Sequence, residues 1–381
     1  MPFAQKTAGR MAYALLLVSS LASVCCSNAP TGRDETITRQ YAFVSNGASN
    51  SVSVVDIASF RVIKTVDVGG GPTGITPSPS RPEVYVVNTD SGTVSILNTE
   101  TLQVESTVRV GRKPFALEVS TDGETGFVAN SGSNSVSVVD LSERRVVKTI
   151  AVGRSPGVAR AAPDGKSLVV SNRGSDTVSI LDPETMTVAA EVAVGSQPGP
   201  IVILPDSAQA FIANSGDASV SAVDLVSRQL LTHLETGKTP ASLALKPDGG
   251  ELFVTNFDSD SITVVNTYAD EVTESLRAGN QPTQGLVDAA GSRYYFTNFN
   301  SNTITIVDID SRRVLVSIQV GTNPDALALT PDGRYVLVAG TQSNDLAVVD
   351  VGQQSLVTVL PLESSPRAIA VKNFEVPSAE P

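Results

Sequence analysis

A proline recurs at every forty-second position through most of the 381-residue chain. An asparagine and a glycine recur at the same interval, and no insertion or deletion breaks the register between Tyr41 and Lys372. The prolines are Pro72, Pro114, Pro156, Pro198, Pro240, Pro282, Pro324 and Pro366. A fixed repeat of this length is typical of architectures in which one supersecondary unit buries its apolar surface against copies of itself. The length alone would allow two or three unrelated domains, and the repeat predicts a single repeat domain instead.

Each repeat unit alternates apolar and polar residues with a period of two. Three short runs rich in β-branched residues lie in 127–130, 135–140 and 146–152, separated by Ser, Asn, Asp and Gly. A fourth run follows the proline, as in 241–245, and ends at the Pro-Asp-Gly turn of 247–249. Such runs are typical of strands, and no helical period of useful length is present. Four strands per unit predict an all-β fold, a β-propeller with one four-stranded blade in every 42 residues.

The number of units sets the number of blades. Eight units cover residues 41–374, which predicts eight blades in a single domain, followed by a short tail at 375–381. The first unit lacks its innermost strand, and the last strand, around 367–371, supplies it, so that the two ends of the chain close the ring. Seven blades with one spare unit are the alternative, since the eighth unit is the most degenerate: Gly340 replaces its asparagine and Glu363 its glycine.

The repeats resemble a known family. Strand ends such as Leu252-Phe-Val-Thr-Asn256 and Tyr294-Tyr-Phe-Thr-Asn298 are followed by a strand of the kind seen in Ser135-Val-Ser-Val-Val-Asp140, and then by V-G-x-x-P. This pattern is similar to the YVTN-type β-propeller repeat over all eight units. The resemblance implies a propeller of the bacterial or archaeal cell surface or periplasm, in a wider group that includes lactonases and the haem domain of a nitrite reductase. It says little about activity, because one fold carries many functions.

The amino-terminal residues predict export. Two cationic residues precede an apolar run that ends in small residues, which is the layout of a secretory signal peptide over residues 1–26. Cys25 and Cys26 are the only cysteines, and either is a candidate for lipidation in a lipoprotein-type leader; plain secretion with loss of both is the alternative. Residues 27–40 are polar and predict a tether. The expected location is the periplasm or the cell surface.

Composition disfavours several kinds of site. Basic residues number 27 and acidic residues 39, which gives a formal net charge of −12. Nucleic-acid binders normally carry a basic surface, so binding of single-stranded nucleic acid stands only as a third hypothesis. A single histidine, His233 on an outer strand, and no cysteine after Cys26 leave few ligands for a metal or a haem and disfavour a Ser-His-Asp triad. We expect no metal, no cofactor and no catalytic residues.

The repeated residues are interpreted as architecture, because an element present in every blade serves every blade. The repeated asparagine ends a strand and enters a tight loop, where its side chain can hydrogen-bond nearby backbone groups. The repeated glycine of the Gly-x-x-Pro link between blades is expected to supply backbone freedom, and the proline to fix the angle of the next strand. The asparagines are Asn46, Asn88, Asn130, Asn172, Asn214, Asn256 and Asn298.

Function is expected where the units differ, on the face that carries the loop after each repeated asparagine and the Gly-x-x-Pro links. Units two to four place a group of cations there, and units six and seven place an aromatic residue directly after the asparagine. The cations are Arg112, Lys113, Arg154 and Arg173, and the aromatic residues are Phe257 and Phe299. A basic sector opposite an aromatic sector on an acidic molecule predicts a recognition surface. Scattered surface variation is the alternative.

Glu118 and Arg160 are long charged residues at a position of the innermost strand where the other units hold mainly small or apolar side chains. Because the blades converge at the axis, we predict that these two side chains approach each other near the channel, as part of the binding surface or as a simple pair between blades. Asp325 is the other acid expected near the channel mouth.

A non-enzymatic, exported, monomeric propeller that binds a protein, a glycan or a small polar ligand is therefore favoured. A lactonase-like hydrolase with a channel-bound metal is the alternative.

Overall fold

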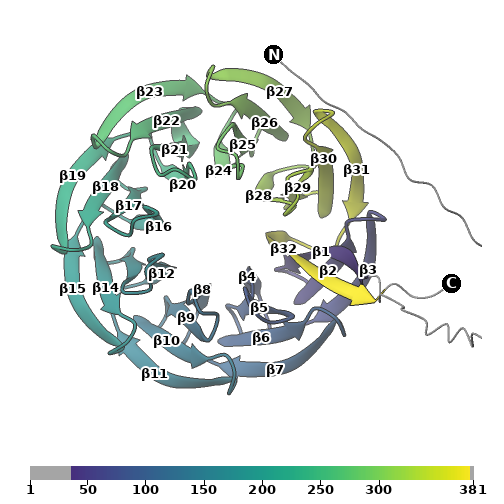
Figure 1. Cartoon of the computed structure of the whole chain (residues 1–381), viewed down its shortest axis with the longest axis horizontal. Helices are drawn as coiled ribbons and strands as arrows, with labels where there is room; N and C mark the ends of the chain where they lie inside the picture. The colour runs from purple at the N-terminus through teal and green to yellow at the C-terminus, as the bar shows by residue number, and fades with distance from the viewer. Residues whose placement is uncertain (1–35, 378–381) are drawn as a thin grey trace, which may run out of the picture. The chain divides into compact units, whose positions relative to one another are not determined.

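The computed structural model describes residues 36–377, of which residues 38–376 form one compact unit. Thirty-two strands in these residues make eight four-stranded antiparallel sheets, which follow one another around a central axis (Figure 1). The prediction of an eight-bladed β-propeller is therefore confirmed, and the alternative of seven blades is wrong. The described residues also contain one 3₁₀ turn, η1 (Phe257–Ser259). No helix within 36–377 has the length and apolar character of a membrane span.

Each blade is a meander of four strands that runs from the axis to the rim. The innermost strands begin at the repeated prolines and are β4 (Pro72–Pro77), β8 (Pro114–Val119), β12 (Pro156–Ala161), β16 (Pro198–Ile203), β20 (Pro240–Leu245), β24 (Pro282–Val287), β28 (Pro324–Leu329) and β32 (Pro366–Pro377). The second strands are β1 (Thr36–Asn46), β5 (Glu83–Asn88), β9 (Thr125–Asn130), β13 (Leu168–Asn172), β17 (Gln209–Asn214), β21 (Glu251–Asn256), β25 (Arg293–Asn298) and β29 (Tyr335–Gly340).

The outer half of each blade continues the same meander. The third strands are β2 (Ser51–Asp56), β6 (Thr93–Asn98), β10 (Ser135–Asp140), β14 (Thr177–Asp182), β18 (Ser219–Asp224), β22 (Ser261–Asn266), β26 (Thr303–Asp308) and β30 (Asp345–Asp350). The outermost strands are β3 (Arg61–Asp67), β7 (Gln103–Arg109), β11 (Arg145–Ala151), β15 (Thr187–Ala193), β19 (Gln229–Glu235), β23 (Glu271–Arg277), β27 (Arg313–Gln319) and β31 (Ser355–Pro361).

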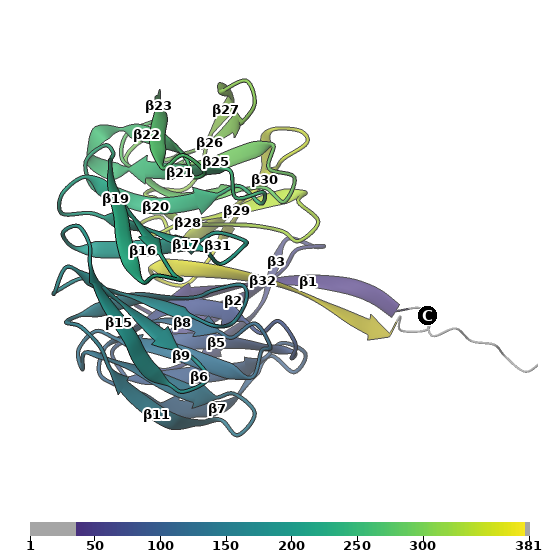
Figure 2. The same ribbon diagram turned by 60° about the vertical axis from the view of Figure 1, so that its left-hand side comes forward.

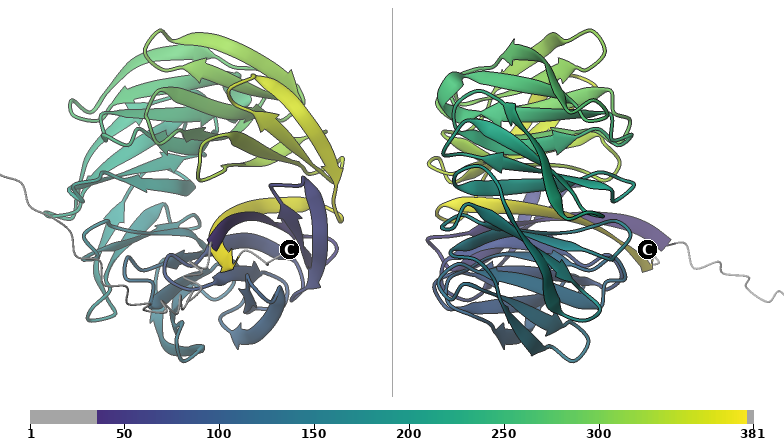
Figure 3. Two further views of the ribbon diagram at one scale, coloured as in Figure 1. Left: turned by 45° about the vertical axis from the view of Figure 1, so that its right-hand side comes forward. Right: turned by 90° about the vertical axis from the view of Figure 1, so that its left-hand side faces the viewer.

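The ends of the chain close the ring. In the first blade the strand order is β3-β2-β1-β32, so the last strand pairs with the first, as expected. The backbone N–H of Ala368 on β32 donates to the Ser45 hydroxyl on β1 at 3.2 Å. β1 begins at Thr36, inside the segment expected as a tether, and β32 runs to Pro377. The two strands therefore continue side by side past the ring (Figures 2 and 3).

The core lies between neighbouring blades. The second and third strands are almost fully buried, because their Val, Ile and Leu side chains point from both faces of the sheet into the two adjacent blades. Phe253 stacks on Tyr294 of the next blade, with ring centroids 4.7 Å apart and planes 20° apart. Full burial of such a side chain stabilises the fold by about 1.5–3 kcal/mol. Packing of sheet on sheet therefore holds the ring together.

The repeated asparagine ties the second strand of each blade to the third. In all seven units that carry it, Nδ2 donates to the hydroxyls of the residues five and seven positions later. Asn214, for example, donates to Ser219 at 2.9 Å and to Ser221 at 2.8 Å. The architectural role is thus confirmed, although the partners are mostly side-chain hydroxyls on the next strand rather than nearby backbone.

The repeated glycine of the link provides space, and the expectation that it supplies backbone freedom is wrong. A Cβ atom at these glycines would lie 2.5–2.7 Å from the asparagine side chain of the next blade. The left-handed backbone falls two positions later, on the residue before the proline, such as Lys113 with a φ of 48°. The glycines packed in this way are Gly69, Gly111, Gly153, Gly195, Gly237 and Gly279.

The ring has two chemically different faces. The loops after the second strands are hydrogen-bonded to the Gly-x-x-Pro links and make one face, called the loop face here. On the opposite face, a residue at the start of a second strand contacts a residue in the outer turn of the next blade; we call these contacts inter-blade latches. They include Glu83 with Arg144, Gln209 with Asp270, Glu251 with Arg312, and Tyr335 with Phe60 across the closure of the ring. The extension of β1 and β32 leaves the ring on this opposite face.

Candidate functional site

The innermost strands line a channel along the axis of the ring. Two hollows in this channel, of about 300 and 400 Å³, are lined between them by side chains from all eight of these strands. A third hollow of about 430 Å³ lies where the channel meets the loop face, and we call it the mouth hollow. Its walls come from β28, β32, β4 and β8, which follow one another around the ring (Figure 1), and from the loops beside them.

Glu118 on β8 and Arg160 on β12 form an ion pair across two adjacent blades, as predicted. Glu118 Oε2 accepts a hydrogen bond from Arg160 Nη1 at 3.0 Å, and its Oε1 accepts one from the Ala161 backbone N–H at 3.1 Å. Burial raises the pKa of the Glu118 carboxyl, and the charge of Arg160 and the Ala161 N–H act against this shift. The two charges satisfy each other, so a structural pair between blades accounts for both residues without a ligand.

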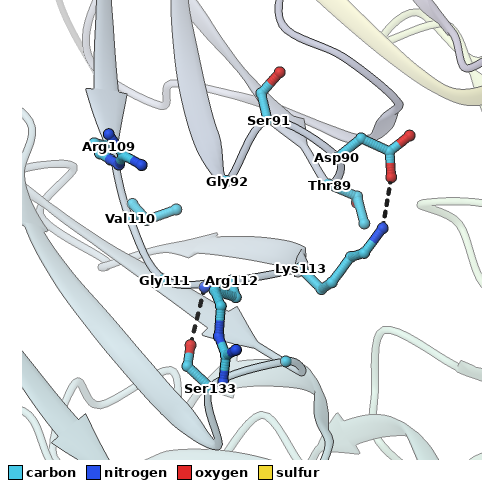
Figure 4. Close-up of a pocket in the computed structure, with 11 residues that line it drawn as sticks. Thr89, Asp90, Ser91, Gly92, Arg109, Val110, Gly111, Arg112, Lys113 and Ser133 are labelled. Carbon is cyan, nitrogen blue, oxygen red and sulfur yellow. Dashed lines mark hydrogen bonds and ion pairs between the residues drawn. The ribbon is translucent and has the colours of Figure 1, made fainter.

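Arg112 and Lys113 lie on the link before β8, beside a surface hollow of about 590 Å³ on the loop face (Figure 4). Lys113 Nζ pairs with Asp90 Oδ1 at 2.8 Å, but both side chains are more than half exposed, and such pairs contribute about 0–1 kcal/mol. Arg112 extends past Ser133 on the other wall of the hollow. Arg109, at the end of β7, also lines it and was not singled out by the sequence. The hollow is therefore lined by three basic side chains and one acidic side chain, Asp90.

Arg154 and Arg173 lie on adjoining segments of the loop face, one blade further around the ring. The backbone N–H of Gly174 donates to the carbonyl of Arg154 at 2.9 Å, and Arg173 Nη2 donates to Gln197 Oε1 at 3.2 Å. Neither arginine lines the hollow beside Arg112. The four predicted cations are thus spread over neighbouring blades, and their joint role as a recognition surface stays a prediction.

Phe257 and Phe299 lie in adjacent blades and contact each other. Their ring centroids are 6.2 Å apart with planes at 57°, and both rings are half-buried. Part of each ring is therefore covered by the other, which favours packing between two loops as their first role. Their use in stacking on a ligand stays a prediction.

Two residues that sequence reasoning did not propose, Arg367 and Phe115, lie at the mouth together with Asp325. They occupy the position directly after the repeated proline, where charged or aromatic residues are found only in one half of the ring and Gly, Ala or Thr stands elsewhere. Four consecutive strands, β28, β32, β4 and β8, carry Asp325, Arg367, Thr73 and Phe115. The four strands across the ring carry Gly157, Gly199, Ala241 and Thr283. Comparing the units at this position would have revealed the asymmetry in the sequence.

Among the described residues, the charged groups of the mouth hollow, Asp325 and Arg367, form no ion pair with each other. Burial raises the pKa of the Asp325 carboxyl, which Arg367 partly opposes, and within the described residues no hydrogen bond reaches that carboxylate. Phe115 is 51% exposed, although it is a large aromatic residue on an innermost strand. The hydroxyl of Thr89 donates to the carbonyl of Pro114 at 2.6 Å and fixes the backbone directly before Phe115. The mouth therefore presents an unpaired acid, a cation and an aromatic face around one cavity.

Other candidate chemistry is placed elsewhere. Within residues 36–377, no three His, Cys, Asp or Glu side chains gather as a metal-ion site would require. His233 lies on β19 at the rim, where its Nδ1 is 3.0 Å from the Ser221 hydroxyl, and so it belongs to the framework of its blade. The predicted signal peptide at 1–26, with Cys25 and Cys26, lies outside the described residues.

Comparisons with known proteins agree on the fold. A family model described as "Lactonase, 7-bladed beta-propeller" matches residues 38–180. No curated protein matches the chain. Hydrazine synthase from Kuenenia stuttgartiensis is 22% identical with a TM-score of 0.62, over 74% of this chain and 95% of that one.

Two further solved structures resemble the chain at low sequence identity. The dihydro-heme d1 dehydrogenase NirN, in complex with DHE, is 18% identical with a TM-score of 0.74, over 87% of this chain and 74% of that one. Apo AztD from Citrobacter koseri is 14% identical with a TM-score of 0.69, over 90% of this chain and 100% of that one. At these identities the structures support the fold alone. The chain is thus an eight-bladed β-propeller similar to the lactonase-type propellers, with repeats that resemble the YVTN type.

Proposed function

We propose that this protein is a non-enzymatic binding protein that takes a small polar ligand in the mouth hollow on its loop face. One observation carries the proposal: after the repeated proline, three strands within one half of the ring hold large or charged residues, Asp325, Arg367 and Phe115, whereas the other five hold only Gly, Ala or Thr. Residues that serve the framework are the same in every blade. Large or charged residues that occur only in one half of the mouth therefore point to a role other than the framework. A volume of about 430 Å³ is in the range of small-molecule sites.

The test is a thermal-shift screen of the purified protein with small carboxylic acids, amines, amino acids, sugars and nucleotides. A ligand at a hundred times its Kd stabilises the folded state by about 2.7 kcal/mol, which raises the melting temperature by a few degrees. We expect at least one class to stabilise the wild type and to lose that effect in the Phe115→Ala and Arg367→Gln variants. If no class does so, or if the shift survives both substitutions, the mouth hollow is not the binding site.

A lactonase-like hydrolase is the second candidate, because the lactonase family model matches residues 38–180. Glu118 and Asp325 are the acids that line the channel hollows, and both oxygens of Glu118 already accept hydrogen bonds, one from Arg160 and one from the Ala161 N–H. Hydrolysis of lactones by the purified protein, lost in the Glu118→Ala variant and accompanied by bound metal in elemental analysis, would replace the binding proposal. We expect neither activity nor stoichiometric metal.

We also propose that the protein works outside the cytoplasm, on the basis of the leader at residues 1–26, and that it is a monomer. Cell fractionation of the expressed full-length chain tests this proposal, and metabolic labelling with a fatty-acid analogue reports whether Cys25 or Cys26 carries a lipid. Recovery of the unprocessed chain in the cytoplasm would contradict it. Size-exclusion chromatography tests the monomer.

A further inference from the structure

The mouth hollow contains two opposite charges on adjacent strands that do not satisfy each other. Asp325 on β28 and Arg367 on β32 both line it, and no ion pair joins them within the described residues. Glu118 and Arg160, which also lie on adjacent innermost strands but four residues after their prolines, do form an ion pair at 3.0 Å. Both residues line the same hollow of about 430 Å³, so a ligand in it can contact either charge.

The other charges near the hollow are already neutralised. Asp90 stands on the rim, where one of its oxygens is taken by Lys113 at 2.8 Å and the other lies against the backbone of Gly71. Asp325 and Arg367 are the charged residues on the innermost strands that line the hollow, and Asp90 lies on its exposed rim beside Lys113. Burial raises the pKa of the Asp325 carboxyl, because water solvates the carboxylate poorly there. A cationic group of a ligand beside this carboxylate would stabilise its charged form.

An apolar wall faces these charges across the hollow. Phe115 on β8 is half-exposed there, and the hydroxyls of Thr73 and Thr89 are 2.7 Å apart beneath it. Thr89 donates its proton to the carbonyl of Pro114 at 2.6 Å, and the single proton of Thr73 serves either Thr89 or the carbonyl of Phe115 at 3.3 Å, so hydroxyl groups fix the backbone directly before the ring. A fixed aromatic face at the edge of a small cavity is suited to an apolar side chain of a ligand.

We propose that the ligand is a free α-amino acid with an apolar side chain. Its carboxylate would pair with the guanidinium of Arg367, its ammonium group with the carboxylate of Asp325, and its side chain would lie on Phe115. This inference rests on the proposed function and names the ligand class of that site. An α-amino acid carries an ammonium group and a carboxylate close together, which matches an anion and a cation on adjacent strands. A simple anion bound to Arg367 would instead leave the carboxylate of Asp325 without a partner.

The test is isothermal titration calorimetry of the full chain with L-leucine and L-phenylalanine. Two analogues separate the charges: N-acetyl-L-leucine lacks the ammonium group and L-leucinamide lacks the carboxylate. We expect the zwitterions to bind and each analogue to bind at least tenfold more weakly. Asp325→Asn should abolish the preference for L-leucine over N-acetyl-L-leucine, and Arg367→Gln the preference for L-leucine over L-leucinamide.

Matched controls exist on one outermost strand. Asp67 and Arg61 on β3 are exposed and lie at the rim, so Asp67→Asn and Arg61→Gln make the same chemical changes away from the mouth and should leave binding unchanged. Circular dichroism and melting temperature show that each variant is folded. Equal binding of N-acetyl-L-leucine and L-leucine, or no binding of any amino acid, overturns the inference. If another class in the thermal-shift screen still depends on Phe115 and Arg367, the proposed function stands without it.

Discussion

Replacement of Arg312 by methionine is expected to weaken the ring at one inter-blade latch. The Arg312 guanidinium pairs with Glu251 of the preceding blade, donates from Nε to Glu274 at 2.5 Å, and lies 5.6 Å from the centre of the Phe253 ring. The side chain of Arg312 is 23% exposed and that of Glu251 26%, which places this cluster between the surface and the core.

The magnitude follows from that intermediate position. Exposed ion pairs contribute about 0–1 kcal/mol, and breaking a fully buried one costs about 3–5 kcal/mol. Solvent screens this cluster in part, so about 1 kcal/mol for each of the two pairs and about 0.5 kcal/mol for the contact with Phe253 are reasonable values. Methionine keeps the aliphatic packing of the arginine stem. The free energy of unfolding should therefore fall by about 2–3 kcal/mol.

Urea denaturation followed by circular dichroism measures this change, with Arg313→Met as the matched control. Arg313 is the next residue, exposed at the start of β27, and its substitution should cost less than about 0.5 kcal/mol. A double-mutant cycle with Glu251→Gln should give a coupling energy of about 1 kcal/mol. Equal losses for the two arginine variants, or a coupling energy near zero, would refute the reasoning.

Three further outcomes are expected. Asn214→Ala removes two buried hydrogen bonds, to Ser219 and Ser221, and should lower the free energy of unfolding by about 1–3 kcal/mol; a urea midpoint within error of wild type would contradict this. Because burial raises the pKa of Asp325, the folded chain binds that proton more tightly than the unfolded chain, and the contribution of this group to stability falls as the pH rises through the carboxyl range. Asp325→Asn should therefore be the more stable protein at about pH 7, with the difference vanishing toward about pH 3, and thermal melts across that range should not run parallel. A chain that ends at Ser365 lacks β32 and leaves β1 as an open edge, so it should elute as aggregates in size-exclusion chromatography, and a stable monomer would argue against closure by the last strand.

The framework could be predicted because it is repeated. Proline, asparagine and glycine at one interval fix the number of blades, and the phase of the first and last strands fixes how the ring closes. The same register predicted the contact of Glu118 with Arg160, since equal repeat positions on adjacent strands are neighbours in space. The role of the repeated glycine could not be read in this way. A glycine repeated at one interval fits either a need for positive φ or a lack of space for a Cβ atom, and the sequence does not distinguish the two. Here the lack of space explains the glycine, and the positive φ falls on the residue before the proline.

The site was predicted less completely, for a related reason. A sector of cations was visible as charge, but the sequence does not show that Lys113 reaches across to Asp90 or that Phe257 and Phe299 cover each other. Arg367 and Phe115 were missed because each is unremarkable in its own unit. They become informative only when the position after the proline is compared around the ring, where neighbours in space are 42 residues apart in the chain.

The place where β1 and β32 leave the ring has a consequence for how the protein can be tethered. Both strands pass the face that carries the inter-blade latches, while the mouth hollow opens on the other. A tether joined to the start of β1 would therefore reach the propeller on the face opposite the proposed ligand site. Immobilisation through the amino terminus should therefore leave ligand capture unhindered, whereas coupling through Lys113 on the rim of the mouth should block it.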